Sequence, residues 1–181
     1  MFYGNLDAMF TQLHGKEISY NNLLDIDAAV NLMGEFDETT VAILKHNNAC
    51  GLASRTTLKE AWNAALAGDP VSAYGGVVIA NREIDAETAT EMDKIFFEVV
   101  IAPGYTTDAL DILKHKKNRM ILIQKPIQPD AKNYRTCLNG VLVQDRDSAI
   151  ELAESFKTVT KAHALAQELD DLVFANKIVK H

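Results

Sequence analysis

A lysine and a histidine stand next to each other where a strongly apolar segment ends. Residues 41–44, Val-Ala-Ile-Leu, form a short continuous apolar run, which is typical of a strand buried on both faces. Lys45 and His46 follow it directly, and Asn47, Asn48 and Gly51 come next; these residues turn a chain or tolerate positive φ, so a loop is expected over 47–51. Ligands in open α/β sheets collect where strands end, so this ammonium and imidazole are candidates for stabilising charge and moving a proton. A solvated loop without chemistry explains the same pair, because most charged residues are exposed.

Two further positions are candidates for ligand contact. Gly75 and Gly76 precede an apolar run at 77–80, and adjacent glycines let a ligand or another backbone approach closely. A tight turn or a bulge explains the same glycines equally well. Glu98 stands at the start of another apolar run, at 99–102. Taken alone it is a surface charge at a strand end.

Apolar periodicity elsewhere predicts strands and helices in alternation. We expect one or two strands within 2–15, further strands at 77–80, 99–102, 119–123 and 140–144, a loop with a short strand at 126–139, and helices at about 21–34, 57–67, 85–96, 108–114 and 164–180. Such alternation predicts a layered α/β domain with a parallel or mixed sheet and helices on both faces. The whole chain, 1–181, is expected to form a single domain.

Capping residues mark the expected helix starts. Asn21 or Asn22 is expected to cap the first helix, and Thr57 with Glu60 has the spacing of a capping box. Near the end of the helix predicted at 85–96, Phe96 is expected to face inward.

Composition limits the classes of function. The 181 residues are 48% hydrophobic with a net charge of −7, which suits a globular protein and argues against a general nucleic-acid binder. The basic cluster at 114–119 is interpreted as a solvated helix C-terminus, with phosphate or folate binding as the alternative. Two distant cysteines suit a reducing compartment, and no basic leader or membrane-length apolar run occurs. The expected location is the cytoplasm.

The segment KHNNACG at 45–51 resembles the Lys-His-x-Asn-Pro-Cys-Gly motif of bacterial aminoimidazole carboxamide ribonucleotide (AICAR) formyltransferases, which are joined to inosine monophosphate (IMP) cyclohydrolase in a bifunctional purine biosynthesis enzyme. Ala49 stands where many members have proline, and the fixed φ of proline would stiffen that turn. Segments 13–30, 68–85, 99–118 and 140–147 resemble the same family in the same order.

The resemblance implies a role for each candidate residue. His46 matches the family's proton acceptor, and Lys45 matches a lysine that stabilises the transferring formyl group or protonates the leaving nitrogen. Gly75 matches a glycine whose backbone lies against the nucleotide. Glu98 matches an acidic residue, usually aspartate, that contacts AICAR. The implied co-substrate is 10-formyltetrahydrofolate, with no metal, no nucleic acid and no membrane, and the implied parent enzyme is a homodimer.

The resemblance also implies that the chain corresponds to the first transferase lobe, whose fold is similar to that of cytidine deaminases. The second lobe and the cyclohydrolase domain are expected to be absent, so little turnover is expected from this chain alone. A non-catalytic remnant that binds a nucleotide or dimerises is the alternative. A zinc hydrolase is a further alternative, but Asn47 and Asn48 follow His46 where that chemistry needs H-x-E, and Cys50 lacks the second cysteine of P-C-x-x-C.

Overall fold

The computed structural model describes residues 4–126, 128 and 130–181. Its contacts divide the chain into two compact units, residues 1–126 and residues 127–181, called here unit 1 and unit 2. Parts of two predictions, the strands within 2–15 and the loop at 126–139, fall outside the described residues. The prediction of a single domain over 1–181 stays a prediction.

Unit 1 is built on a six-stranded mixed sheet in the order β1-β6-β5-β4-β2-β3. Strands β4, β5 and β6 are parallel to one another, while β1 pairs antiparallel with β6 and β2 pairs antiparallel with both β4 and β3. The central strands are apolar and buried on both faces, as the continuous apolar runs predict. The strands are β1 (Phe10–His14), β2 (Thr40–Lys45), β3 (Asn48–Ser54), β4 (Val77–Ala80), β5 (Val99–Ala102) and β6 (Met120–Gln124).

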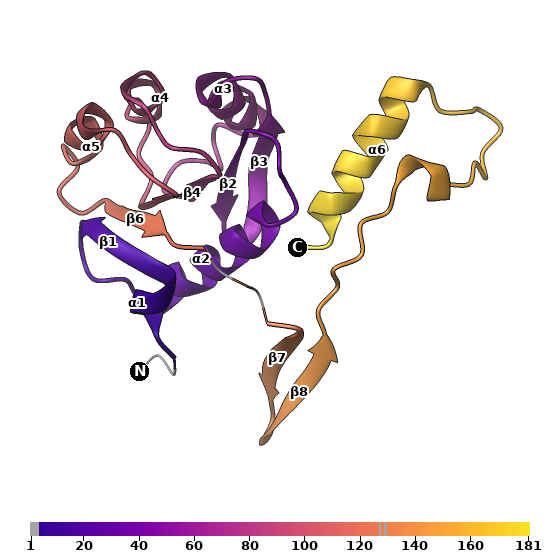
Figure 1. Ribbon diagram of the computed structural model, residues 1–181, viewed down its shortest axis with the longest axis horizontal. Helices are drawn as coiled ribbons and strands as arrows, with labels where there is room; N and C mark the ends of the chain where they lie inside the picture. The colour runs from indigo at the N-terminus through magenta and orange to yellow at the C-terminus, as the bar shows by residue number, and fades with distance from the viewer. Residues whose placement is uncertain (1–3, 127, 129) are drawn as a thin grey trace. The chain divides into compact units, whose positions relative to one another are not determined.

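Helices cover both faces of this sheet (Figure 1). Helices α3, α4 and α5 pack together on one face, where they share one apolar cluster with the sheet, and α2 packs against β2 and β4 from the other face. The prediction of an α/β mixed sheet with helices on both faces is therefore confirmed. The helices of unit 1 are α1 (Leu6–Met9), α2 (Tyr20–Met33), α3 (Leu58–Gly68), α4 (Ala86–Met92) and α5 (Thr107–Leu113).

The helix caps agree with the sequence in one case and differ in another. Thr57 and Glu60 form the predicted capping box at the start of α3. The cap of α2 is Ser19, which forms a capping box with Asn22. The prediction of Asn21 or Asn22 as the cap is wrong, because the Ser19 hydroxyl satisfies the backbone N–H of Asn22 and the helix therefore begins at Tyr20.

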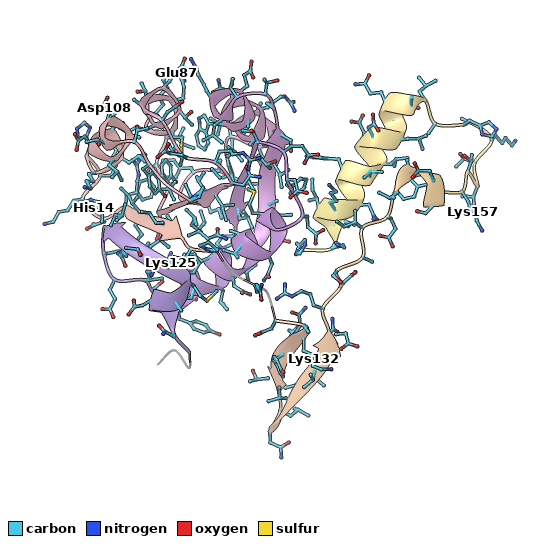
Figure 2. All side chains as sticks on the ribbon, in the orientation of Figure 1. His14, Glu87, Asp108, Lys125, Lys132 and Lys157 are labelled. Carbon is cyan, nitrogen blue, oxygen red and sulfur yellow. The ribbon has the colours of Figure 1, made fainter. Side chains whose placement is uncertain are left out.

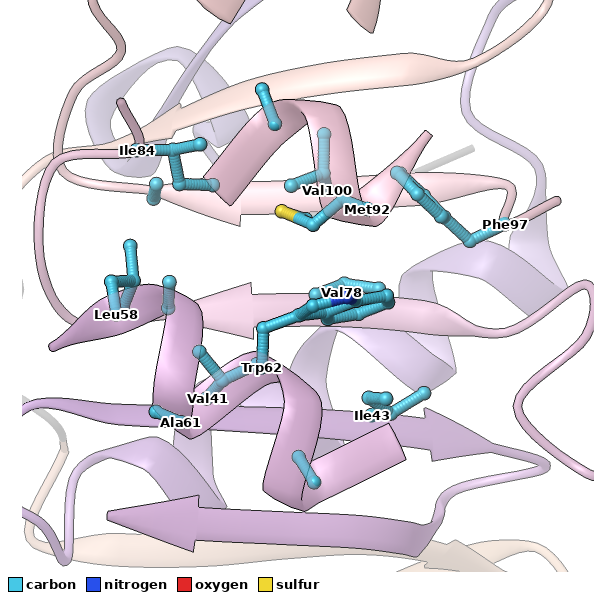
Figure 3. Packing of buried hydrophobic residues seen from close by; sticks show 14 of the residues in the cluster. Val41, Ile43, Leu58, Ala61, Trp62, Val78, Ile84, Met92, Phe97 and Val100 are labelled. Carbon is cyan, nitrogen blue, oxygen red and sulfur yellow. The ribbon is translucent and has the colours of Figure 1, made fainter. Parts of the chain in front are cut away.

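The apolar cluster between the sheet and α3–α5 is centred on Trp62 of α3, which lies over Val78 of β4 in Figure 3. The rings of Trp62 and Phe97 pack edge to face, with centroids 6.3 Å apart. The prediction that Phe96 faces inward is wrong, since Phe96 is 38% exposed and Phe97 is buried. Helix α4 ends at Met92, so the helical period no longer sets which side chain is buried.

Unit 2 contains a β-hairpin and one long helix. Strands β7 (Lys132–Cys137) and β8 (Gly140–Asp145) pair antiparallel, a single 3₁₀ turn covers Ala153–Ser155, and α6 spans Ala166–Val179. The predictions for 140–144 and 164–180 are confirmed. None of the described side chains of unit 2 is buried, and those of Lys132 and Lys157 extend away from the backbone in Figure 2. Across the described residues of the chain, no helix is both long enough and apolar enough to cross a membrane.

Candidate functional site

His46 lies in the tight turn of a β-hairpin. Strand β2 ends at Lys45 and pairs with Asn48, where β3 begins, so His46 and Asn47 are the only residues between the strands. Both have positive φ, 55° and 65°, which is the pattern of a type I′ turn that matches the twist of paired strands. The prediction that 47–51 continues as a loop is therefore wrong, because the chain reverses within two residues and pairs with β2.

Gly51 belongs to β3 and is needed for packing. A Cβ at this position would lie 1.9 Å from the carbonyl oxygen of Ala65 on α3, so only glycine lets the helix backbone come this close to the strand.

The neighbouring Cys50 lies at a register shift in the hairpin, and its Sγ donates to the carbonyl of Ile43 at 3.3 Å. Burial raises the pKa of the Cys50 thiol, which does not favour a thiolate nucleophile there.

Lys45 contacts the segment that carries the two glycines. Its Nζ donates to the carbonyl oxygen of Tyr74 at 2.8 Å. The contact follows from the sheet register, since Leu44 of β2 pairs with Val77 of β4. The ammonium has three donors, and Lys45 is partly exposed, so donors other than the one to Tyr74 can serve a ligand.

Gly75 and Gly76 have different reasons to be glycine. Gly75 has φ 77°, a conformation that residues with a Cβ rarely adopt, and the nearest atom to an added Cβ is Cε1 of Phe96 at 3.9 Å. Its N–H donates to the carbonyl of Phe96 at 2.8 Å. A Cβ on Gly76 would lie 2.7 Å from the carbonyl oxygen of Leu44. Gly76 therefore accommodates the neighbouring strand, while Gly75 forms a turn in which an added Cβ would make only an ordinary contact with the Phe96 ring.

Glu98 lies on the other side of the same two glycines. Its backbone N–H donates to the carbonyl of Gly76 at 2.9 Å, because β4 and β5 are parallel with Val77 opposite Val99. Lys45, Gly75 and Glu98 are thus gathered at one end of the sheet, where β2 ends and β4 and β5 begin. Lys45 lies at the carboxyl end of β2, as the apolar run predicts, but the parallel strands β4 and β5 contribute their amino ends.

Two partners of Glu98 were not expected from the sequence. Its Oε2 accepts hydrogen bonds from Lys16 Nζ and from Asn22 Nδ2, both at 3.2 Å. The Lys16 and Glu98 side chains are 47% and 35% exposed, so water screens this ion pair. Lys16 and Asn22 are 82 and 76 residues away from Glu98 in sequence, and no local pattern links them.

The imidazole of His46 is exposed next to these groups. Two hydrogen bonds hold the peptide group between His46 and Asn47: Asn48 Nδ2 donates to the carbonyl of His46 at 2.8 Å, and the N–H of Asn47 donates to Oδ1 of Asp25 at 2.7 Å. Lys45 and Glu98 are both hydrogen-bonded to the 74–76 segment that contains Gly75, whereas His46 is joined to this group through its peptide bond to Lys45.

Arg119 corrects the interpretation of the basic cluster at 114–119. Residues 114–118 are exposed at the end of α5, but Arg119 is buried, with its guanidinium 4.0 Å from the centre of the Phe97 ring. Nη1 donates to Asp93 Oδ1 at 2.7 Å and to the carbonyl of Leu113 at 3.1 Å. Burial lowers its pKa from the ordinary value, against the effect of Asp93. Arg119 is therefore a packing residue and not part of a solvated helix end.

The described residues hold no group of three His, Cys, Asp or Glu side chains placed to bind a metal ion. What they do present at the amino ends of β4 and β5 is an ammonium, a carboxylate and an open glycine turn, with an exposed imidazole adjoining. These groups can bind an anionic or polar ligand, offer a positive charge to a developing oxyanion and accept a proton.

The family model described as "AICARFT/IMPCHase bienzyme" matches residues 2–181. The chain belongs to this family. It is 63% identical over 180 residues to the bifunctional purine biosynthesis protein PurH of Bacteroides thetaiotaomicron, which covers 99% of the chain and 36% of that relative. It is 47% identical over 174 residues to PurH of Ruminiclostridium cellulolyticum, covering 94% and 34%, and 48% identical over 180 residues to PurH of Chlorobium phaeobacteroides, covering 98% and 34%. The chain thus spans about a third of the length of these relatives.

Proposed function

We propose that the chain acts in purine biosynthesis by transferring the formyl group of 10-formyltetrahydrofolate to the 5-amino group of AICAR. Support comes from membership of the AICARFT/IMPCHase bienzyme family over residues 2–181 together with the hydrogen-bonded grouping of Lys45, Gly75 and Glu98. This grouping assigns the proposed reaction to particular residues. It brings together, at one end of the sheet, three positions that are 53 residues apart at most in the sequence.

Each residue has a task in this reaction. The amine of AICAR forms a bond to the formyl carbon and loses a proton, which a neutral imidazole at His46 accepts. The carbonyl oxygen gains negative charge, and the Lys45 ammonium stabilises it. When the bond from the formyl carbon to the folate nitrogen breaks, that nitrogen takes a proton, from Lys45 or from the imidazolium. The chemistry balances without a redox step.

The binding residues fit a flat, polar nucleotide base. Gly75 has no side chain to keep a ligand away from its backbone, and the Glu98 carboxylate can accept a hydrogen bond from the AICAR amine. Holding the amine, the formyl carbon and the imidazole in one geometry supplies a large share of any rate enhancement. The relatives are about three times longer than this chain. We therefore propose that further residues of the full-length enzyme, including residues of a partner subunit, enclose the two substrates.

The test is formyl transfer measured with AICAR and 10-formyltetrahydrofolate, by the chain alone and by the chain mixed with a separately made second transferase lobe. We expect little turnover by the chain alone and a clear rate in the mixture. The variants His46→Ala and Lys45→Met should lower kcat by about 100-fold or more. The controls His115→Ala and Lys117→Met, in the exposed basic segment, should match wild type.

Two results would count against the proposal. One is a folded mixture that binds AICAR but shows no formyl transfer, which would favour a non-catalytic nucleotide-binding protein. The other is transfer that survives unchanged in both His46→Ala and Lys45→Met.

A further inference from the structure

Asp25 on α2 contacts the turn that carries His46. Its Oδ1 accepts a 2.7 Å hydrogen bond from the backbone N–H of Asn47. Asp25 and Asn47 are 22 residues apart, so the contact is tertiary rather than a local turn motif. The acceptor is held firmly, because α2 buries Asn22 and Ile26 on either side of it in sequence and packs against both β2 and β3.

The turn needs such an anchor for two reasons. His46 and Asn47 both have positive φ, which is disfavoured for residues with a Cβ, although asparagine tolerates it better than histidine. In a hairpin with two turn residues, the ladder bonds are made by the flanking residues, so the N–H of the exposed Asn47 has no partner in the ladder and is available to an acceptor outside it. Asp25 supplies this acceptor, and its negative charge strengthens the bond.

We propose that Asp25 is a positioning residue that holds the 46–47 turn in its left-handed conformation and thereby fixes the direction of the His46 imidazole. This inference rests on the proposed function of His46. Without the hydrogen bond from Asn47 to Asp25, the turn samples other conformations, and the His46 imidazole spends less time within reach of the AICAR amine. Lys45, Gly75 and Glu98 keep their own hydrogen bonds, so substrate binding is largely retained while the proton-transfer step slows.

The first part of the test needs no activity. The exchange rate of the Asn47 amide hydrogen is measured by NMR in the wild-type chain and in Asp25→Ala, Asp25→Asn and Asp27→Ala. Asp27 is exposed on the same helix and serves as the matched control, while the amide of Ile43 in β2 reports on the sheet. We expect Asp25→Ala to speed exchange at Asn47 about tenfold and to leave Ile43 unchanged. Asp25→Asn keeps an oxygen acceptor and should stay near wild type.

The second part uses formyl transfer in the mixture with the second lobe. We expect kcat to fall about tenfold in Asp25→Ala with KM for AICAR within about twofold of wild type. Adding Asn47→Gly should restore most of kcat, because glycine adopts positive φ without the steric penalty. A residue that merely stabilises the fold would not be rescued in this way.

The outcomes separate the two claims. Unchanged Asn47 exchange in Asp25→Ala, equally fast exchange at Ile43, or no rescue by Asn47→Gly would each overturn the positioning role. Absence of formyl transfer by wild type would contradict the proposed function only, and the exchange rates would still decide whether Asp25 anchors the turn.

Discussion

Lys45, Gly75 and Glu98 are held at the site chiefly through backbone groups. The Lys45 ammonium donates to a carbonyl, the Gly75 N–H donates to a carbonyl, and the Glu98 N–H does the same. Side-chain types were therefore a sound guide to which residues to consider, but they could not indicate the partners. The Glu98 carboxylate illustrates this, since its partners Lys16 and Asn22 come from a distant part of the sequence.

Glu98→Gln should separate binding from stability. The ion pair with Lys16 is partly exposed, so its loss should change the free energy of unfolding in urea by no more than about 1 kcal/mol. A hydrogen bond from AICAR to a carboxylate contributes more to the binding free energy than a hydrogen bond to the neutral amide of glutamine. We therefore expect the Kd for AICAR to rise about tenfold in Glu98→Gln.

The matched control for Glu98→Gln is Lys16→Met, which removes the same ion pair but keeps the carboxylate. It should have a similar effect on unfolding and a smaller effect on the Kd. An unchanged Kd in Glu98→Gln, measured by calorimetry, would remove Glu98 from the site.

Among the elements, the β2–β3 hairpin positions Lys45 and His46. Its tight turn sets where Lys45 and His46 stand, and its close contact with α3 at Gly51 fixes the hairpin to the rest of unit 1. The hairpin also extends the sheet beyond β2, so the 46–47 turn is part of a paired hairpin rather than a free loop.

Gly51→Ala tests this contact. The added Cβ would overlap the backbone carbonyl of Ala65 at 1.9 Å, and neither backbone can move without disturbing the sheet or α3, so we expect a loss of about 3 kcal/mol or more in unfolding free energy. Gly34→Ala is the control, because its nearest neighbour is an ordinary 3.4 Å away and its φ is −63°; it should change stability by less than about 1 kcal/mol. Equal effects in thermal unfolding would contradict the packing role of Gly51.

The elements show what the sequence could and could not predict. Continuous apolar runs located β2, β4, β5 and β6, and capping chemistry located α3, because both are local signals. The hairpin was missed because Asn47, Asn48 and Gly51 favour turns on their own, and the requirement for Gly51 comes from a helix carbonyl 14 residues later in the chain. Arg119 was taken for a solvated cation because its ring partner, Phe97, lies 22 residues earlier.

For the whole molecule, the apolar core of unit 1 contains one ionisable phenol that makes stability depend on pH. Tyr105 donates to the carbonyls of Val100 and Leu122 at 3.1 and 2.9 Å, and burial raises its pKa well above the ordinary value. The folded pKa thus exceeds the unfolded one, so this contribution to stability is complete below about pH 10 and is lost as the pH rises through the folded pKa.

We therefore expect unfolding free energy to fall above about pH 10 and to fall less steeply in Tyr105→Phe. Tyr20→Phe, at a side chain that is 74% exposed, should behave as wild type. Unfolding free energy is measured by urea titration at each pH. If it falls equally steeply with pH in wild type and in Tyr105→Phe, Tyr105 is not the cause of the pH dependence.

The two units should differ sharply in local stability. The central strands of unit 1 are wholly buried, whereas no described side chain of unit 2 is buried, so little apolar burial stabilises β7, β8 or α6. In hydrogen exchange followed by mass spectrometry, peptides from 132–145 and 166–179 should exchange at least about 100-fold faster than peptides from 77–80 and 99–102. Equal protection in both units would show that unit 2 is covered in solution.

The most direct test of the central claim is a titration of the isotope-labelled chain with AICAR, followed by NMR of the backbone amides. If the ligand binds where β2 ends and β4 and β5 begin, the amides of Lys45, His46, Gly75, Gly76 and Glu98 shift on binding, while those of Ala80 and Ala102, at the opposite ends of β4 and β5, stay in place. Shifts concentrated at Ala80 and Ala102, or saturable AICAR binding with no shift at Gly75 and Glu98, would contradict the account.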